Sequence, residues 1–145
     1  MPNKVEGIVI HHSDQVDRPK GLDWTGIRAY QMSYRVDYSV VDPAIYAQRK
    51  AAGRGTKFEE PAQDIAYNLG LELVNDTLRL QVGRDTGIDG AHTAGWNGRS
   101  LGVCLVGDFD TVAPSPALMR GLVSLLVCLC TIYELPASAI LGHRE

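Results

Sequence analysis

The sequence predicts an α/β fold, a single domain in which a mixed central β-sheet is flanked by helices. Short β-branched apolar runs alternate along the chain with segments of helical periodicity, a pattern typical of that class. Two of these runs are joined by a short polar turn, which predicts hairpin character in the middle of the sheet. The chain has 145 residues, 45% hydrophobic and 21% charged, as expected for one globular domain with its own core.

The first half of the chain contains one clear strand and one clear helix. Residues 7–11 form a β-branched run that ends in polar sequence, and they predict a buried strand. Asp23 is placed to cap a helix over residues 24–34, whose apolar residues share one face. Residues 36–60 are less regular, and only 44–52 predict a helical turn or two within them.

The second half predicts most of the sheet. Residues 64–74 predict a strand, Asn75-Asp76 a turn, and the alternating residues 77–82 the second strand of a hairpin. Residues 83–98 contain five glycines and predict a loop that turns tightly or wraps a ligand. Residues 100–106 are apolar almost throughout and predict a central strand.

The longest helix is predicted near the end of the chain. Ser115 is a candidate cap and Pro116 fits a first helical turn, so the helix extends from there to about Tyr133. Its centre, residues 122–130, is apolar nearly all round, and we expect it to be packed on both sides. Residues 139–142 then predict a last short strand that leads into the sequence's final histidine.

Composition and charge argue against several classes of function. The chain has 14 Lys and Arg against 17 Asp and Glu, a net charge of −3, whereas a nucleic-acid binder usually carries a basic excess. No run approaches about 18 apolar residues, so no membrane insertion is expected. The first seven residues lack the apolar core of a signal peptide, which predicts synthesis in the cytoplasm or a removed leader. The pattern indicates no particular oligomeric state.

The cysteines predict no disulfide framework. They are few and odd in number, and each lies in an apolar run: Cys104, Cys128 and Cys130. We expect all three to be buried, unreactive thiols.

Two histidines follow buried strands at opposite ends of the chain. His11 ends the first strand, and His143 follows the last. Sites in open α/β sheets gather at the carboxyl ends of strands, and imidazole is the commonest metal ligand, so a metal site is one interpretation. A pair of hydrogen-bonded histidines at strand ends is the other. His12 should point to the opposite face of the strand from His11.

Five sequence motifs narrow this choice because they occur together and in a fixed order. They are IVIHHS (8–13), DIAYN (64–68), GAHTAGWN (90–97), RSLGVCLVGDF (99–109) and LGHRE (141–145). Together they resemble the zinc-dependent N-acetylmuramoyl-L-alanine amidases of the phage-lysozyme and peptidoglycan-recognition-protein superfamily. The resemblance implies an amidase domain over residues 1–145, with an insertion at about 36–60.

The resemblance implies roles for particular residues. His11 and His143 match two zinc ligands of the family, and Tyr67 matches a tyrosine that aids catalysis beside the metal. His92, Trp96 and Asn97 fall in the segment that lines the family's substrate groove. A catalytic zinc activates water for attack on an amide, so these residue types fit that chemistry.

Structural alternatives remain open for several of these residues. Tyr67 can be a core aromatic whose hydroxyl is satisfied, and His92 a loop histidine bonded to backbone. Trp96 can stack on a sugar or peptide, or simply cover the core. The family's glycine and phenylalanine around the tyrosine are replaced by Ala66 and Leu69, mild departures that keep Tyr67 in register.

One departure from the family pattern concerns the third zinc ligand. The family places a cysteine or aspartate roughly eight to ten residues after the Gly-His motif, and this sequence ends two residues after His143. The domain is therefore expected to be truncated at its C-terminus or to have an incomplete site. Glu145 is a poor substitute because a terminal residue anchors a metal weakly, and the three cysteines lie elsewhere in the sequence.

The resemblance implies hydrolysis of the bond between N-acetylmuramic acid and L-alanine in peptidoglycan or muropeptides. An endolysin of phage or prophage origin, which reaches the wall after release, and a wall-recycling or autolytic enzyme both fit. The alternative is a catalytically inactive peptidoglycan-binding domain. An unrelated α/β hydrolase lacks support, since no Gly-x-Ser-x-Gly elbow is present.

Overall fold

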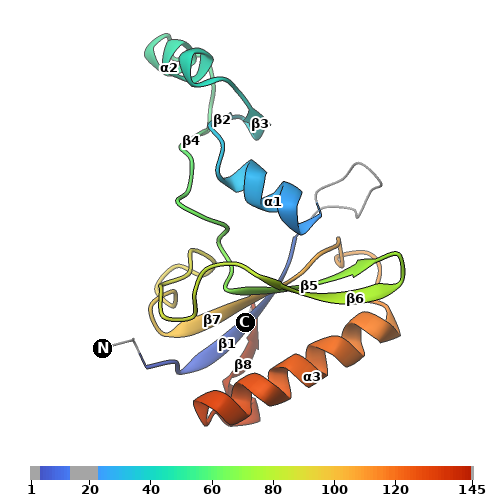
Figure 1. Cartoon of the computed structure of the whole chain (residues 1–145). Helices are drawn as coiled ribbons and strands as arrows, with labels where there is room; N and C mark the ends of the chain where they lie inside the picture. The colour runs from blue at the N-terminus through green and yellow to red at the C-terminus, as the bar shows by residue number, and fades with distance from the viewer. Residues whose placement is uncertain (1–3, 14–22, 145) are drawn as a thin grey trace.

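The structure is a computed structural model that describes residues 4–13 and 23–144. Its centre is a five-stranded sheet in the order β6-β5-β7-β1-β8 (Figure 1). The strands are β1 (Gly7–His12), β5 (Leu69–Val74), β6 (Thr77–Val82), β7 (Ser100–Leu105) and β8 (Ile140–Gly142).

The sheet is mixed, as the sequence predicts. β1 pairs in parallel with β7 and β8, and β5 pairs in parallel with β7, whereas β5 and β6 form an antiparallel hairpin. Asn75 and Asp76 make its turn with positive φ, a conformation that these two residue types adopt more readily than most. The hairpin lies at an edge and not in the middle of the sheet, because β7 and β1 pair with each other and leave it outside.

Helix α3 (Pro116–Tyr133) covers one face of the sheet and has the predicted bounds. The Ser115 hydroxyl caps it by accepting a hydrogen bond from a first-turn N–H. One face is buried in the main core through Leu118, Leu122, Leu126 and Leu129. The expectation of packing on both sides is wrong: Val123 and Val127 are 55% and 61% exposed, because among the described residues only the sheet side offers a packing surface.

One-sided packing changes two further expectations. By length and composition alone, α3 is long and apolar enough to cross a membrane. Core helices of globular proteins can have the same composition, and the leucines of α3 pack in the main core. Cys128 is exposed on α3 and Cys130 is half-buried, so only Cys104, in β7, is the fully buried thiol expected of all three. Burial raises the pKa of Cys104 to about 12, despite an opposing hydrogen bond from Tyr67.

Helix α1 (Trp24–Gln31) lies on the other face of the sheet and begins at the predicted cap (Figure 1). The Asp23 carboxylate accepts a first-turn N–H at 2.7 Å, and the buried carboxylate of Glu72 accepts the N–H of Trp24 at 3.1 Å. The Trp24 indole rests on β5 at Gly70, where a Cβ atom would approach it to 2.2 Å. The helix is shorter than predicted because the chain turns away into a separate small sheet.

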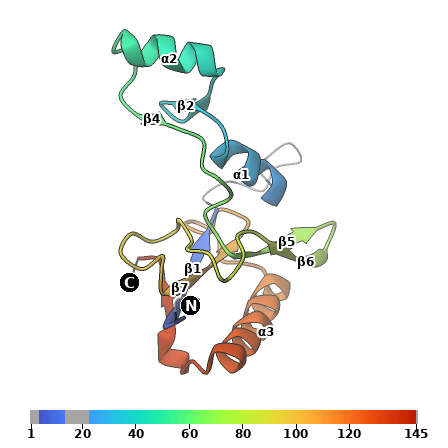
Figure 2. The same ribbon diagram turned by 60° about the vertical axis from the view of Figure 1, so that its left-hand side comes forward.

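That small sheet occupies the segment expected to be an insertion. It joins β2 (Arg35–Val36), β3 (Ser39–Val40) and β4 (Phe58–Glu59), with α2 (Pro43–Ala51) between β3 and β4. The predicted helical stretch is thus a regular helix. Figures 1 and 2 show this unit projecting past α1, away from the central sheet.

The strand predicted over residues 64–74 begins only at Leu69. The carbonyls of Ala66 and Tyr67 accept hydrogen bonds from the N–H groups of Ala91 and Arg84, which belong to the glycine-rich loop. Because this loop takes the backbone groups that a neighbouring strand would use, the strand prediction is wrong for 64–68. Tyr67 therefore lies just before the strand.

The one-sided packing of α3 predicts unequal effects of two similar substitutions. We expect Leu122→Ala to lower the free energy of unfolding by about 2–5 kcal/mol, because it removes buried methyl groups and leaves a cavity. Val127→Ala, on the exposed side, should change it by less than about 0.5 kcal/mol. Urea denaturation of both variants measures the difference, and equal effects would show that both faces of α3 are packed.

Candidate metal and substrate site

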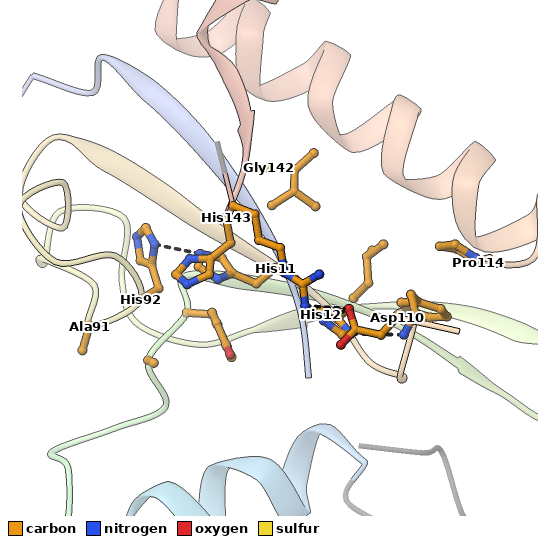
Figure 3. A pocket seen from close by; sticks show the side chains of 14 residues that line it. His11, His12, Ala91, His92, Asp110, Pro114, Gly142 and His143 are labelled. Carbon is orange, nitrogen blue, oxygen red and sulfur yellow. Dashed lines mark hydrogen bonds and ion pairs between the residues drawn. The ribbon is translucent and has the colours of Figure 1, made fainter. Parts of the chain in front are cut away.

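A pocket of about 630 Å³ lies at the carboxyl ends of β1, β7 and β8. All four histidines of the chain line it, although they come from three distant parts of the sequence. Its other lining residues are Ile10, Ala66, Tyr67, Ala91, Leu105, Phe109, Asp110, Pro114, Gly142 and Arg144. Figure 3 shows His11, His92 and His143 close together, and His12 apart from them beside Asp110.

His11 and His143 lie side by side in this pocket (Figure 3). β1 and β8 are parallel neighbours, and the N–H of His143 donates to the carbonyl of Ile10 at 3.0 Å, which continues their pairing. The two imidazole centroids are 4.4 Å apart, with the ring planes tilted by 43°. The structure therefore brings together the two candidate metal ligands from opposite ends of the sequence.

Burial keeps His11 in its neutral form. The residue is only 8% exposed, and burial, followed by the nearby His92, His143 and His12, lowers its pKa to about 3. Burial also lowers the pKa of His92. Neutral imidazole is the form that coordinates metals, so His11 needs to lose no proton before binding one at neutral pH.

The described residues supply only part of a metal site. Across 4–13 and 23–144, no group of three His, Cys, Asp or Glu side chains is arranged to hold a metal ion. Glu145, considered above as a ligand, lies outside the described residues. The assignment of His11 and His143 as metal ligands stays a prediction.

Tyr67 lies beside His11 at the wall of the pocket. The two ring centroids are 5.2 Å apart, and the Tyr67 ring is 6.4 Å from that of Trp24. The Tyr67 side chain also forms a hydrogen bond with the thiol of Cys104. Tyr67 therefore borders both the core and the pocket, and its catalytic role stays a prediction.

The three residues predicted to contact substrate occupy different surroundings. His92 lines the pocket, 8% exposed, with Nδ1 3.1 Å from Nε2 of His11. Asn97 does not line it, and its Oδ1 accepts the N–H groups of His92 and Thr93, each at 2.8 Å. Trp96 also lies outside the pocket lining and stacks under the Arg99 guanidinium at 4.1 Å. Their substrate roles stay predictions.

The opposite end of the pocket is polar. His12 lines the pocket together with His11, although neighbouring side chains alternate along β1. Nδ1 of His12 accepts the N–H of Phe109 at 3.1 Å. The Asp110 carboxylate lies 3.7 Å from Nε2 of His12 and accepts a hydrogen bond from Arg144 at 2.8 Å. These contacts tie together the chain segments that follow β1, β7 and β8.

Comparison with known proteins places this site in a family. The family model described as Amidase_2, N-acetylmuramoyl-L-alanine amidase, matches residues 1–145. The chain belongs to the N-acetylmuramoyl-L-alanine amidase family. The endolysin of Escherichia phage T7 is 39% identical to this amidase-family chain over 87 residues, which cover 57% of the chain and 54% of the endolysin. Peptidoglycan-recognition protein 1 of Holotrichia diomphalia is 25% identical over 137 residues, or 85% of the chain and 68% of that protein.

Solved structures confirm the fold of this amidase-family domain. The endolysin amidase LysCS from Clostridium intestinale superposes with a TM-score of 0.63 at 20% identity, covering 97% of this chain and 70% of that one. A human peptidoglycan recognition protein, PGRP-IBETAC in complex with glycosamyl muramyl pentapeptide, has a TM-score of 0.60 at 18% identity, covering 99% and 73%. The match to the phage endolysins spans about half of their length.

Asn68, which the sequence did not single out, organises the surroundings of the pocket. Asn68 is 1% exposed; its Oδ1 accepts the N–H of Gly102, and its Nδ2 donates to the carbonyls of Asp85 and Ile88. It thereby holds the glycine-rich loop against β7. Arg84 braces the same loop by donating to three backbone carbonyls. Neither role has a local sequence signal, because all but one of the bonded backbone groups lie at least 17 residues away along the chain.

Proposed function

We propose that this member of the amidase family hydrolyses the amide bond between the lactyl group of N-acetylmuramic acid and L-alanine in peptidoglycan, with zinc as its cofactor. The observation that carries the proposal is the convergence of the four histidines on one pocket, with His11 and His143 in ring contact. Tyr67, the candidate catalytic tyrosine, borders the same pocket. The family match supports the choice of bond.

The donor set fits zinc. His11 and His143 would hold the ion, and a buried neutral imidazole is a preferred zinc ligand. A catalytic zinc takes three protein ligands and keeps one position open, so a third ligand would come from outside the described residues. When bound, zinc supplies Lewis-acid activation of water and of the amide carbonyl.

The chain's own residues would share the remaining tasks. The Tyr67 hydroxyl, freed from the Cys104 thiol, would donate a hydrogen bond to the carbonyl oxygen as negative charge develops on it. Ile10, Leu105 and Phe109 are apolar residues of the pocket lining, and they would limit the access of bulk water to the reacting amide. These residues therefore orient the substrate and shield the reacting amide.

The biological setting that we propose is degradation of the bacterial wall by an endolysin, synthesised in the cytoplasm and active after release. The phage endolysins among its relatives support this setting. Recycling of soluble muropeptides uses the same bond chemistry and differs only in the size of the substrate.

A second function is favoured by two observations. The described residues contain no complete group of three metal ligands, and the relatives include peptidoglycan recognition proteins. A peptidoglycan-binding domain without hydrolytic activity is therefore the alternative.

A single assay separates the two functions. The protein is incubated with purified peptidoglycan in the presence of zinc or after chelation, and newly exposed L-alanine amino groups and reducing sugar ends are both quantified. Zinc-dependent release of amino groups without new reducing ends is expected of the amidase. Co-sedimentation with the wall without amino-group release would identify the binding domain. A protein that neither releases amino groups nor co-sediments with the wall would contradict both functions.

A further inference from the structure

His92 is held rigidly in the pocket by the glycine-rich loop. Its ring lies where Cβ atoms at Gly90 and Gly102 would approach it to 2.3 and 2.5 Å, so only glycine at these positions leaves room for the imidazole. Its backbone N–H and that of Thr93 both donate to Asn97. The ring therefore has a fixed position over β7.

The fixed ring meets His11 through a defined pair of atoms. Nδ1 of His92 lies 3.1 Å from Nε2 of His11. The Thr93 hydroxyl lies 3.0 Å from Nδ1 of His92 and 3.4 Å from Nε2 of His11. Both hydrogen bonds that described residues make to the His11 ring use Nε2. Nδ1 is therefore the nitrogen of His11 that remains for a ligand.

A hydrogen bond between two neutral imidazoles fixes their tautomers, because one nitrogen must carry the proton and the other must accept it. If His11 carries its proton on Nε2, its Nδ1 keeps a lone pair for a metal. The opposite arrangement would place the proton on Nδ1 and block coordination there. A partner on the second ring nitrogen commonly sets the orientation and tautomer of a metal-binding histidine.

We propose that His92 is a positioning residue whose Nδ1 accepts the Nε2–H of His11 and so presents Nδ1 of His11 as the zinc-binding nitrogen. The Thr93 hydroxyl bridges the same two nitrogens and supports the arrangement. This inference rests on the proposed zinc-dependent function, and it gives His92 a role that requires no contact with substrate. It also explains why the loop has glycine at position 90 and β7 has glycine at position 102.

The first test reads the tautomers directly in metal-free protein. Imidazole 15N chemical shifts should show His11 protonated at Nε2 and His92 with an unprotonated Nδ1. In His92→Ala the preference of His11 for the Nε2–H form should weaken. An Nδ1–H form of His11 in the unsubstituted chain would overturn the inference, whatever the protein does with zinc.

The second test measures zinc affinity by competition with a chromophoric chelator. We expect His92→Ala to bind zinc about 10–100-fold more weakly, the usual effect of removing such a partner. His92→Asn should recover most of the affinity, because its amide oxygen can take the place of Nδ1 as acceptor. Thermal melting of each variant shows that the fold is retained.

The outcomes distinguish this inference from the proposed function. Equal zinc affinity in the unsubstituted chain, His92→Ala and His92→Asn would overturn the role of His92 and leave zinc-dependent hydrolysis standing. Failure of the unsubstituted whole gene product to bind zinc would overturn the zinc-dependent function and, with it, the presentation of His11 to zinc. Weak binding by His92→Ala with recovery in His92→Asn would support both.

Discussion

Replacing His11 with alanine is expected to abolish zinc binding and peptidoglycan hydrolysis together. The imidazole, at the end of β1, is one of the two proposed ligands among the described residues. The fold should persist, because the backbone at position 11 stays paired with Cys104 of β7. Elemental analysis after zinc loading and desalting measures the metal, and release of L-alanine amino groups measures hydrolysis, both in the whole gene product.

A matched control for this variant lies one residue along β1. His12→Ala removes the same ring from the same strand, but Nδ1 of His12 is used by the N–H of Phe109 and its Nε2 faces Asp110. Zinc content should therefore be retained in His12→Ala and lost in His11→Ala. Undiminished zinc content and hydrolysis in His11→Ala would refute the proposed metal site.

Tyr67→Phe is expected to reduce the hydrolytic rate by about 100-fold or more while leaving zinc content unchanged. The substitution keeps the ring beside His11 and removes only the hydroxyl that would donate to the developing negative charge. The loss should fall mainly on kcat, since the interaction strengthens in the transition state. Steady-state kinetics on a soluble muropeptide, with parallel zinc analysis, measures both quantities.

Tyr46→Phe provides the control for Tyr67→Phe. Tyr46 is a buried tyrosine that belongs to α2 in the small projecting unit and does not line the pocket. The Tyr46→Phe variant should hydrolyse the muropeptide at the same rate as the unsubstituted protein. A normal rate in Tyr67→Phe would instead identify Tyr67 as a core aromatic whose hydroxyl serves only Cys104.

Local chemistry made several elements predictable from the sequence. Asp23, Asp42 and Ser115 each cap a helix with their own side chain, and their effect does not depend on distant residues. The turn at Asn75-Asp76 is similarly local, because these residues tolerate positive φ. Helix starts and the turn of the hairpin therefore agree closely with prediction.

Elements whose limits depend on distant partners were less predictable. Residues 64–68 have strand-like composition, yet the glycine-rich loop takes their backbone hydrogen bonds. The centre of α3 is apolar on all sides, yet only the leucine face has a sheet against it. Local composition shows which side chains of a segment are apolar enough to be buried. The packing of the sheet, helices and loops then decides which of them are buried.

The sequence by itself determined the α/β class, the family, and His11 and His143 as candidate metal ligands, because these rest on local patterns and on motifs in order. Only the tertiary structure decided that His12 shares their pocket, that Trp96 and Asn97 stand outside its lining, and that His92 contacts His11. The physical reason is that these contacts join residues from separate strands and a loop. Their distances are set by strand register and by the space that Gly90 and Gly102 leave for the His92 ring.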